Sequence, residues 1–240
     1  MKYVSIILCH YAQIDDFGGE AAGAVPRSRF GLLYDCITSL KKNTDYPAEL
    51  IVMDNGGSPD DTQFLLDKVR DGTINTLVRY KENRNFAYAW NEGARIATGD
   101  YISFICNDIE FLPGWLSASV KILEDYPDKQ YVATPFITYD KRKHTTEITK
   151  EGYRVNMRSG SNCMVMRRED WPKLGEFPNH RIGGSLWYTK NFREGWWFVA
   201  PPNDLAIDRG WRQGTNFRIP IEVKKVLLTG QEIHYEEHQP

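Results

Sequence analysis

Short apolar runs alternate with segments of helical periodicity through the first half of the chain, and this alternation limits the folds available to it. The apolar runs, which are typical of buried strands, are residues 4–9, 50–53, 76–79 and 101–106. Between them, apolar side chains recur at helical spacing, as at Leu33, Cys36, Ile37 and Leu40. A repeated strand–helix order predicts an α/β fold with a doubly wound, mostly parallel sheet covered by helices.

Composition and charge exclude several classes of protein. The chain has 240 residues and a formal net charge of −2, so it carries no global positive field for nucleic acid. No C-x-x-C pair occurs among the four cysteines, which argues against a zinc or redox motif. No apolar run is long enough for a signal peptide or a membrane span. We therefore expect a cytoplasmic protein with no transmembrane segment and no nucleic-acid partner.

The second half of the chain has a different character. It is crowded with Gly, Pro and aromatic residues and lacks a clean period. Residues 138–158 predict a loop or irregular hairpin, 161–166 a strand and 168–174 a short helix. No segment resembles a linker, so we expect a single domain over residues 1–240. Its first half, about 1–120, carries the regular α/β pattern, and its elaborated second half covers about 121–240.

Polar residues follow three of the predicted strands, at the point where each strand ends. They are His10 and Tyr11, Asp54 and Asn55, and the segment 107–110. Ligands of open parallel sheets bind beyond the carboxyl ends of the strands, so these groups should converge on one crevice. Tyr11 is a candidate to stack on a base, and Asp54 to bind a base or ribose. The alternatives are simple packing for Tyr11 and an Asx-turn for Asp54.

The acidic pair Asp108 and Glu110 is the sharpest chemical signal. If the strand geometry continues, residues two apart point to the same side, so both carboxylates face one site. Hard oxygen ligands suit Mg²⁺ or Mn²⁺ bridging a diphosphate. The alternative for an isolated pair of this kind is a solvated turn after the strand. Asn91, on the helix predicted from about residue 86, either faces the same crevice or is solvated.

The order of these motifs resembles family 2 of the inverting glycosyltransferases. That family usually reads close to N-x-G-F-A-x-A-x-N-x-G, then A-T-G-D-Y, then N-D-D/N-x-E. This chain reads N-R-N-F-A-Y-A-W-N-E-G at 83–93, A-T-G-D-Y at 97–101 and N-D-I-E at 107–110. The resemblance covers about residues 3–120, and the segment 159–168 is similar to the family's segment before its acceptor helix.

The resemblance implies a GT-A fold with a Rossmann-like nucleotide-sugar-binding half and a C-terminal acceptor half. It implies an inverting transfer from a nucleotide-diphosphate sugar to the hydroxyl of a glycan or other acceptor, aided by Mn²⁺ or Mg²⁺, as in polysaccharide biosynthesis. The positions matching Tyr11 and Asp54 hold the base in that family, and those matching Asp108 and Glu110 hold the metal. Asn85 and Asn91 are counted with the donor-binding residues, although Asn85 replaces a frequent Gly.

An inverting transfer also needs a carboxylate that takes the acceptor proton. The family supplies it from an E-D pair that is not intact here, and the best counterpart is the segment 203–211. Asp204 is therefore the first candidate for the base, with Asp208 and Glu194 as alternatives; an N-cap is the structural alternative for Asp204. His234 is a candidate metal ligand, or a solvated residue near the C-terminus.

Two other functions stay open at this point. A sugar-phosphate nucleotidyltransferase would show a Gly-rich phosphate loop after the first strand, which this chain lacks. A GT-A-like protein that binds nucleotide or sugar without catalysis is compatible with the damaged E-D pair. Aromatic residues of the second half could form an acceptor platform, but we expect most of them in the core: Trp187, Tyr188, Trp196, Trp197, Phe198 and Trp211.

Overall fold

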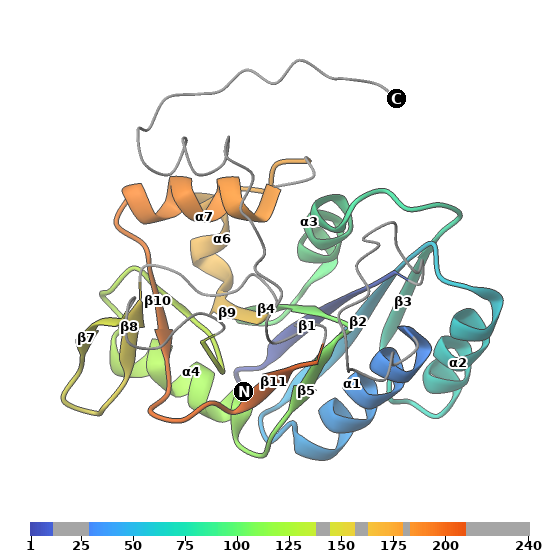
Figure 1. Ribbon diagram of the computed structural model, residues 1–240, viewed down its shortest axis with the longest axis horizontal. Helices are drawn as coiled ribbons and strands as arrows, with labels where there is room; N and C mark the ends of the chain where they lie inside the picture. The colour runs from blue at the N-terminus through green and yellow to red at the C-terminus, as the bar shows by residue number, and fades with distance from the viewer. Residues whose placement is uncertain (12–28, 138–144, 157–162, 180–182, 210–240) are drawn as a thin grey trace, which may run out of the picture. The chain divides into compact units, whose positions relative to one another are not determined.

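A nine-stranded sheet runs through the computed structural model, which describes residues 1–11, 29–137, 145–156, 163–179 and 183–209 (Figure 1). In sheet order its strands are β3 (Thr76–Tyr80), β2 (Ala48–Asn55), β1 (Val4–His10), β4 (Tyr101–Cys106), β9 (Cys163–Arg167), β6 (Tyr131–Ala133), β10 (Trp197–Ala200), β8 (Arg154–Asn156) and β7 (Thr145–Ile148). A separate two-stranded sheet pairs β5 (Ile109–Phe111) with β11 (Ala206–Asp208).

The first half of the chain forms the predicted parallel part of the sheet. Strands β3, β2, β1 and β4 all run in the same direction, with His10 opposite Asp54 and Cys9 opposite Cys106. The helices that connect or follow these strands are α1 (Arg29–Asn43), α2 (Pro59–Arg70), α3 (Phe86–Ile96) and α4 (Trp115–Asp125). This confirms the α/β fold class and aligns the carboxyl ends of β1, β2 and β4 at one edge.

The second half extends the sheet with mixed pairings. β9 pairs antiparallel with β4 and β6, β10 runs parallel to β6, and β8 pairs antiparallel with β10. The predicted strand at 161–166 is β9, and the irregular hairpin expected within 138–158 is β7–β8, with a register shift near Glu147. By these pairings β6 and β10 point the same way as β4, so they begin at the opposite edge from its carboxyl end.

Two hydrophobic cores cover the two faces of the sheet. On one face α1, α2 and α4 contribute Leu33, Leu65 and Leu116. On the other face lie α3, α6 (Trp171–Leu174) and α7 (Gly183–Arg193), which contribute residues such as Trp90 and Trp187. Figure 1 shows these two groups of helices on either side of the strands. None of the helices in the described ranges is long and apolar enough to cross a membrane.

The four cysteines lie within or beside the hydrophobic cores. All are free thiols, and three are fully or nearly fully buried while Cys106 is partly buried. Burial raises the pKa of Cys9 to about 12, with the Asp54 carboxylate as a second cause. Burial likewise raises the pKa values of Cys36, Cys106 and Cys163 above the ordinary value. Thiols held protonated in this way are poor nucleophiles, so they serve packing rather than chemistry.

Candidate active site

The polar strand ends meet as predicted at the carboxyl edge of β1, β2 and β4. His10 ends β1 and lies opposite Asp54 at the end of β2. The Asn107 side-chain nitrogen, just after β4, lies 2.8 Å from His10 Nδ1. Because an amide nitrogen can only donate, Nδ1 of this imidazole accepts the hydrogen bond. The convergence expected from the parallel sheet is therefore confirmed.

His10 itself is a residue whose importance the sequence reasoning missed. It is fully buried, and its Nε2 lies 3.4 Å from the buried Asp61 carboxylate at the start of α2. Asp61 also forms a capping box with Ser58, the N-cap of α2. The imidazole thus ties the end of β1 to both β4 and α2 and holds the floor of the crevice in place.

The Asp54 side chain holds the turn after β2, which was the alternative to a role in binding a base or ribose. Its side chain is fully buried, and Oδ1 accepts a hydrogen bond from the Gly57 backbone N–H at 2.7 Å. A Cβ on Gly57 would lie 2.5 Å from that oxygen, so only glycine fits there. Arg79, opposite Asp54 on β3, brings its Nε within 3.4 Å of Oδ2. Tyr11 follows β1 at the same edge and is partly exposed.

A chain of asparagine side chains shapes the loop before α3. The buried Asn55 accepts a hydrogen bond from the Arg84 backbone N–H and donates one to Asn83 Oδ1, both at 2.8 Å. Asn83 Oδ1 also accepts from the Asn85 N–H at 2.8 Å, and Asn85 Oδ1 caps α3 through the Ala87 N–H at 3.2 Å. This network connects the end of β2 to the start of the helix that carries the N-x-x-F-A motif.

Asn85 has backbone angles that explain the family's frequent glycine at its position. With φ 74° and ψ 145°, it is the one non-glycine residue of positive φ in the described ranges. This region of backbone space is open to glycine and costs other residues about 1–3 kcal/mol. The Asn85 side chain offsets part of that cost by capping α3. The asparagine therefore strains the backbone at this position but stabilises the start of the helix.

We expect Asn85→Gly to stabilise the protein by about 1 kcal/mol. The change removes the backbone strain of about 1–3 kcal/mol, while a Gly at an N-cap loses only a few tenths relative to Asn. Urea unfolding of the two proteins measures the difference. The matched variant Asn85→Ala keeps the strained φ and loses the cap, so it should be less stable than the parent protein. A glycine variant less stable than the parent would contradict the assignment of strain.

Asp108 and Glu110 lie where β4 leads through a short turn into β5. They alternate with the buried residues Ile109 and Phe111 and are themselves only partly buried. Asn107 and Asp108 form a turn between β4 and β5, and the strand that begins at Ile109 pairs with β11 in the register Glu110 opposite Ile207. Asp108 thus lies in a turn, which was the alternative for this pair, while Glu110 lies on a paired strand. That both carboxylates serve one metal site stays a prediction.

Arg209 lies directly against this acidic pair, which no pattern in the sequence indicates. Its Nε and Nη2 both lie 2.6 Å from Glu110 Oε2, and its backbone N–H donates to the Asp108 carbonyl at 2.8 Å. The two segments are 99 residues apart. A guanidinium at this place adds a fixed positive charge beside the two carboxylates, where a ligand phosphate would also find a donor.

The acidic pair fits a divalent cation only in company with a ligand. Among the residues that the structure describes, no group of three or more His, Cys, Asp and Glu side chains could hold a metal. Mg²⁺ sites in proteins often use one or two carboxylates and complete their shell with substrate phosphates and water. Asp108 and Glu110 match that donor set, although Glu110 shares Oε2 with Arg209. His234 lies outside the described residues.

The three candidate bases are placed very differently. Asp204 lies between β10 and β11, and its Oδ1 is 2.7 Å from Arg154 Nη2 on β8. Asp208 ends β11 opposite Ile109, close to the acidic pair. Both therefore lie at the carboxyl edge of the sheet. The pairing with Arg154 also gives Asp204 a role other than the helix N-cap that was its structural alternative.

Glu194 is excluded as a base by the strand order. It precedes β10, which starts with Trp197 opposite Tyr131 at the start of β6. Both strands begin at the edge opposite the carboxyl end of β4, so Glu194 lies across the sheet from the acidic pair. Its carboxylate is 3.8 Å from Lys190, on the surface of α7.

Asn91 does not face the crevice, and it is not solvated either. Its side chain is buried on the α3 face, where Nδ2 donates to the Phe177 carbonyl at 2.9 Å. Its Oδ1 accepts from the Phe177 N–H at 3.0 Å. These two bonds fasten α3 to the segment after α6, so the expectation of Asn91 as a donor ligand is corrected to a structural one.

Most of the aromatic side chains of the second half are in the core, as expected. Trp187, Trp196 and Phe198 are buried, and Trp187 packs against Phe177 with ring centroids 4.7 Å apart. Tyr188 lies against Phe198 at 4.5 Å. Trp211 falls outside the described residues. Among the described members of this group, Tyr188 and Trp197 are partly exposed.

Comparison of the sequence with models of known families shows the family to which the chain belongs. The model of the family described as "Glycosyl transferase family 2" matches residues 28–190, a stretch that includes both the asparagine network and the acidic pair. The chain belongs to glycosyl transferase family 2. Its members are transferase enzymes, and this glycosyltransferase carries the D-x-E motif within the matched region.

Individual relatives agree with this assignment. The chain is 26% identical over 129 residues to the glucosyl-dolichyl phosphate glucuronosyltransferase of Haloferax volcanii, covering 52% of this chain and 35% of that protein. A mannosyltransferase from Pyrobaculum calidifontis, solved with GDP-Man and Mn²⁺, has a TM-score of 0.63 and 18% identity. GalNAc-T7, solved with UDP, GalNAc and Mn²⁺, has a TM-score of 0.62 and 14% identity.

Because their sequence identity is low and this chain spans only part of their length, the two solved structures show the fold alone. The two structures cover 88% and 84% of this chain, but the chain spans only 58% and 42% of their own lengths. It spans about a third of the curated relative. The structural neighbours are glycosyltransferases of the GT-A type, and this confirms the predicted fold class.

Proposed function

We propose that this chain transfers a sugar, with inversion, from a nucleotide-diphosphate sugar to a hydroxyl of a glycan or other acceptor, and that a divalent cation is required. The observation that carries the proposal is the position of Asp108 and Glu110, in the turn after β4 and on β5, at the carboxyl edge of the sheet. The Mn²⁺ and nucleotide ligands of the two structural neighbours support it. A role in polysaccharide biosynthesis is part of the same proposal.

The donor would lie across the ends of β1, β2 and β5. Tyr11 and Asp54 are proposed to meet the base, and Asn85 is proposed to shape the donor pocket from the start of α3. Asp108 and Glu110 would hold Mn²⁺ or Mg²⁺, which when bound neutralises charge on the diphosphate. The guanidinium of Arg209 would add a positive charge beside that of the cation. Its hydrogen bond to Glu110 holds it next to the proposed metal site.

Asp204 is the proposed general base. It lies at the same edge as the acidic pair, in the connection that leads from β10 into β11. Arg154 holds Oδ1 at 2.7 Å and so restricts the orientation of the carboxylate, which can then take the proton of the acceptor hydroxyl. Asp208 stays the alternative because it lies beside the acidic pair.

A thermal-shift series with UDP, GDP, CDP and dTDP, each with Mn²⁺, Mg²⁺ or EDTA, tests the proposal. A ligand that binds only the folded state increases the free energy of unfolding, by about 2.7 kcal/mol at a concentration of 100 times its Kd. The melting temperature rises as a result. We expect one nucleoside diphosphate to stabilise the protein with metal and to lose most of this effect in EDTA. No shift with any of the four would contradict the donor site.

A further inference from the structure

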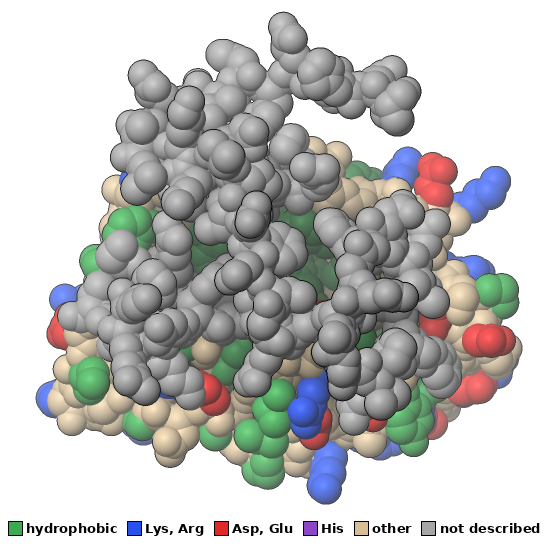
Figure 2. Space-filling view, in the orientation of Figure 1, with side chains coloured by type: hydrophobic (Ala, Val, Ile, Leu, Met, Phe, Trp, Pro, Cys, Tyr) green, Lys and Arg blue, Asp and Glu red, His purple; other side chains and the backbone are tan. Residues whose placement is uncertain are grey.

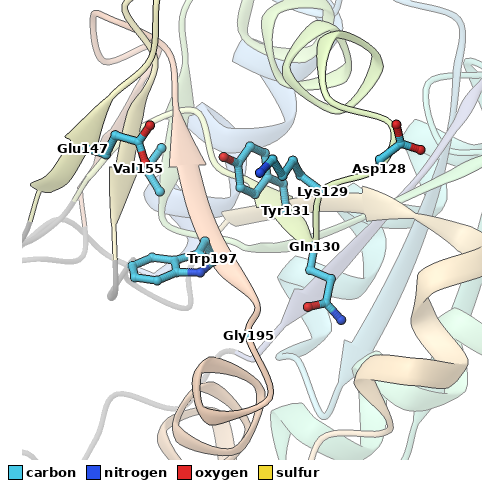
Figure 3. A pocket seen from close by; sticks show the side chains of 8 residues that line it. All are labelled: Asp128, Lys129, Gln130, Tyr131, Glu147, Val155, Gly195 and Trp197. Carbon is cyan, nitrogen blue, oxygen red and sulfur yellow. The ribbon is translucent and has the colours of Figure 1, made fainter.

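A cavity lies away from the acidic pair, between residues of β6, β7, β8 and β10. It has a volume of about 420 Å³, and Figure 3 shows the side chains that surround it. Tyr131 and Trp197 line it from the first positions of β6 and β10. These strands begin at the edge opposite the carboxyl end of β4, so the cavity and the acidic pair Asp108 and Glu110 lie at opposite edges of the sheet.

A rigid aromatic wall forms one part of this cavity. Trp197 is partly exposed, and its ring meets Phe192 edge to face, with centroids 5.2 Å apart and an interplanar angle of 84°. Its backbone N–H donates to the Gln130 carbonyl at 2.9 Å. A side chain that already packs against a neighbouring ring loses less conformational entropy when a ligand binds. The electron-rich face of such a ring attracts the polarised C–H groups of a sugar.

Polar groups of several kinds surround the aromatic wall. Asp128 and Glu147 offer carboxylates that accept hydrogen bonds, Lys129 donates, and the Gln130 amide does both. Burial raises the pKa of Tyr131, and the Glu147 carboxylate is the second cause. With two carboxylates and one ammonium, this lining disfavours phosphates and other anions but suits neutral ligands rich in hydroxyls.

Glycine at position 195 gives the Gln130 side chain its place. Gly195 has φ +90°, and a Cβ there would lie 2.9 Å from Gln130 Oε1. The amide of Gln130 can therefore lie flat against the backbone at the base of Trp197. The volume of the cavity falls within the range of about 300–1,000 Å³ that is usual for small-molecule sites.

We propose that this cavity is a binding site for a neutral sugar unit, with Trp197 stacking on the ring and Gln130 and Glu147 hydrogen-bonding its hydroxyls. The site is separate from the proposed transfer site, so it would hold a distant part of a glycan rather than the reacting hydroxyl. Binding at this cavity does not require transfer, and the proposal stands or falls independently of the proposed function.

Saturation-transfer NMR with maltose, cellobiose, lactose and N,N′-diacetylchitobiose tests the proposal. We expect at least one disaccharide to bind with a Kd in the millimolar range, and Trp197→Ala to weaken it at least 5-fold. Gln130→Ala, which leaves the indole in place, should weaken it to a smaller extent. Tyr34→Ala, which removes an aromatic residue that is 49% exposed on α1, is the matched control and should change nothing.

Two further comparisons separate this cavity from the transfer site. Saturating UDP with Mn²⁺ and the Asp108→Ala variant should both leave disaccharide binding unchanged. The proposal would be overturned by the absence of any signal with the four disaccharides, by unchanged binding in Trp197→Ala and Gln130→Ala, or by competition with UDP. If Trp197→Ala does not fold, as judged by its thermal transition, Gln130→Ala and Glu147→Gln decide the question.

Discussion

Asp108→Ala should lower the rate of sugar transfer by about 10²- to 10³-fold while the protein stays folded. The carboxylate lies two residues before Glu110, and its loss removes one of two proposed ligands of the cation that neutralises the diphosphate. Losing a single electrostatic contact to a developing charge costs catalysis about this much. Nucleotide released from the donor, measured at saturating donor, gives the rate.

The control for Asp108→Ala is Asp67→Ala on α2. Asp67 is exposed and pairs with Arg70 at 2.7 Å, so its loss changes the total charge equally without touching the crevice. Surface pairs of this kind contribute little to stability. Both variants should melt close to the parent protein, and only Asp108→Ala should lose activity. Equal activity of the two variants would contradict the role assigned to the acidic pair.

Asp204→Asn should lower kcat by about 10²- to 10⁴-fold and leave the KM for the donor close to that of the parent protein. An amide keeps the shape of the side chain but cannot take the acceptor proton, and general-base contributions are of this size. The donor is expected to contact the ends of β1, β2 and β5, which this change leaves intact. Steady-state kinetics with varied donor separates the two parameters.

Asp208→Asn is the matched variant for Asp204→Asn because the two carboxylates lie near opposite ends of the same short strand. We expect Asp208→Asn to lower kcat less than Asp204→Asn. Arg154→Ala removes the partner of Asp204 and should fall between the two, since the carboxylate remains but its orientation is no longer held. A larger loss for Asp208→Asn than for Asp204→Asn would transfer the role of base to Asp208.

Local patterns account for the parts of this protein that could be predicted. Strands β1, β2 and β4 are buried apolar runs of six to eight residues, long enough to be recognised, and their parallel order follows from the helices between them. The two-residue period of a strand predicts that Asp108 and Glu110 face one site, but the strand begins only at Ile109, because Asp108 lies in the turn before β5. The motif at 83–93 needed no three-dimensional information either.

Pairings between distant segments account for what could not be predicted. Strands β5, β6, β8 and β11 have three residues each, too few for a periodic signal. The contact between Arg209 and Glu110 exists only because β11 pairs with β5. Glu194 was a reasonable candidate until the order of β6 and β10 in the sheet placed it at the wrong edge.

Buried polar side chains are a second source of error, because a sequence does not show which partner satisfies them. Asn91 lies on the helix of the family motif, yet both of its hydrogen bonds go to Phe177, 86 residues away. His10 could be seen to end a strand, but its contacts with Asn107 and Asp61 depend on three separate elements. Asn85 shows the opposite situation, because the glycine that is frequent at this position in the family indicates a positive φ. The structure has that backbone conformation at Asn85.

Donor consumption is the measurement that tests whether this chain is a metal-dependent sugar transferase. The protein would be incubated with UDP-, GDP-, CDP- and dTDP-sugars and a mixture of oligosaccharide acceptors, with Mn²⁺ or with EDTA, and released nucleotide would be measured. We predict that one nucleotide class is released with Mn²⁺, that EDTA stops the release, and that Asp108→Ala lowers it at least 100-fold. A nucleoside diphosphate that binds with metal, while no donor is consumed by transfer or by slow hydrolysis, would contradict catalysis and leave a nucleotide-binding protein.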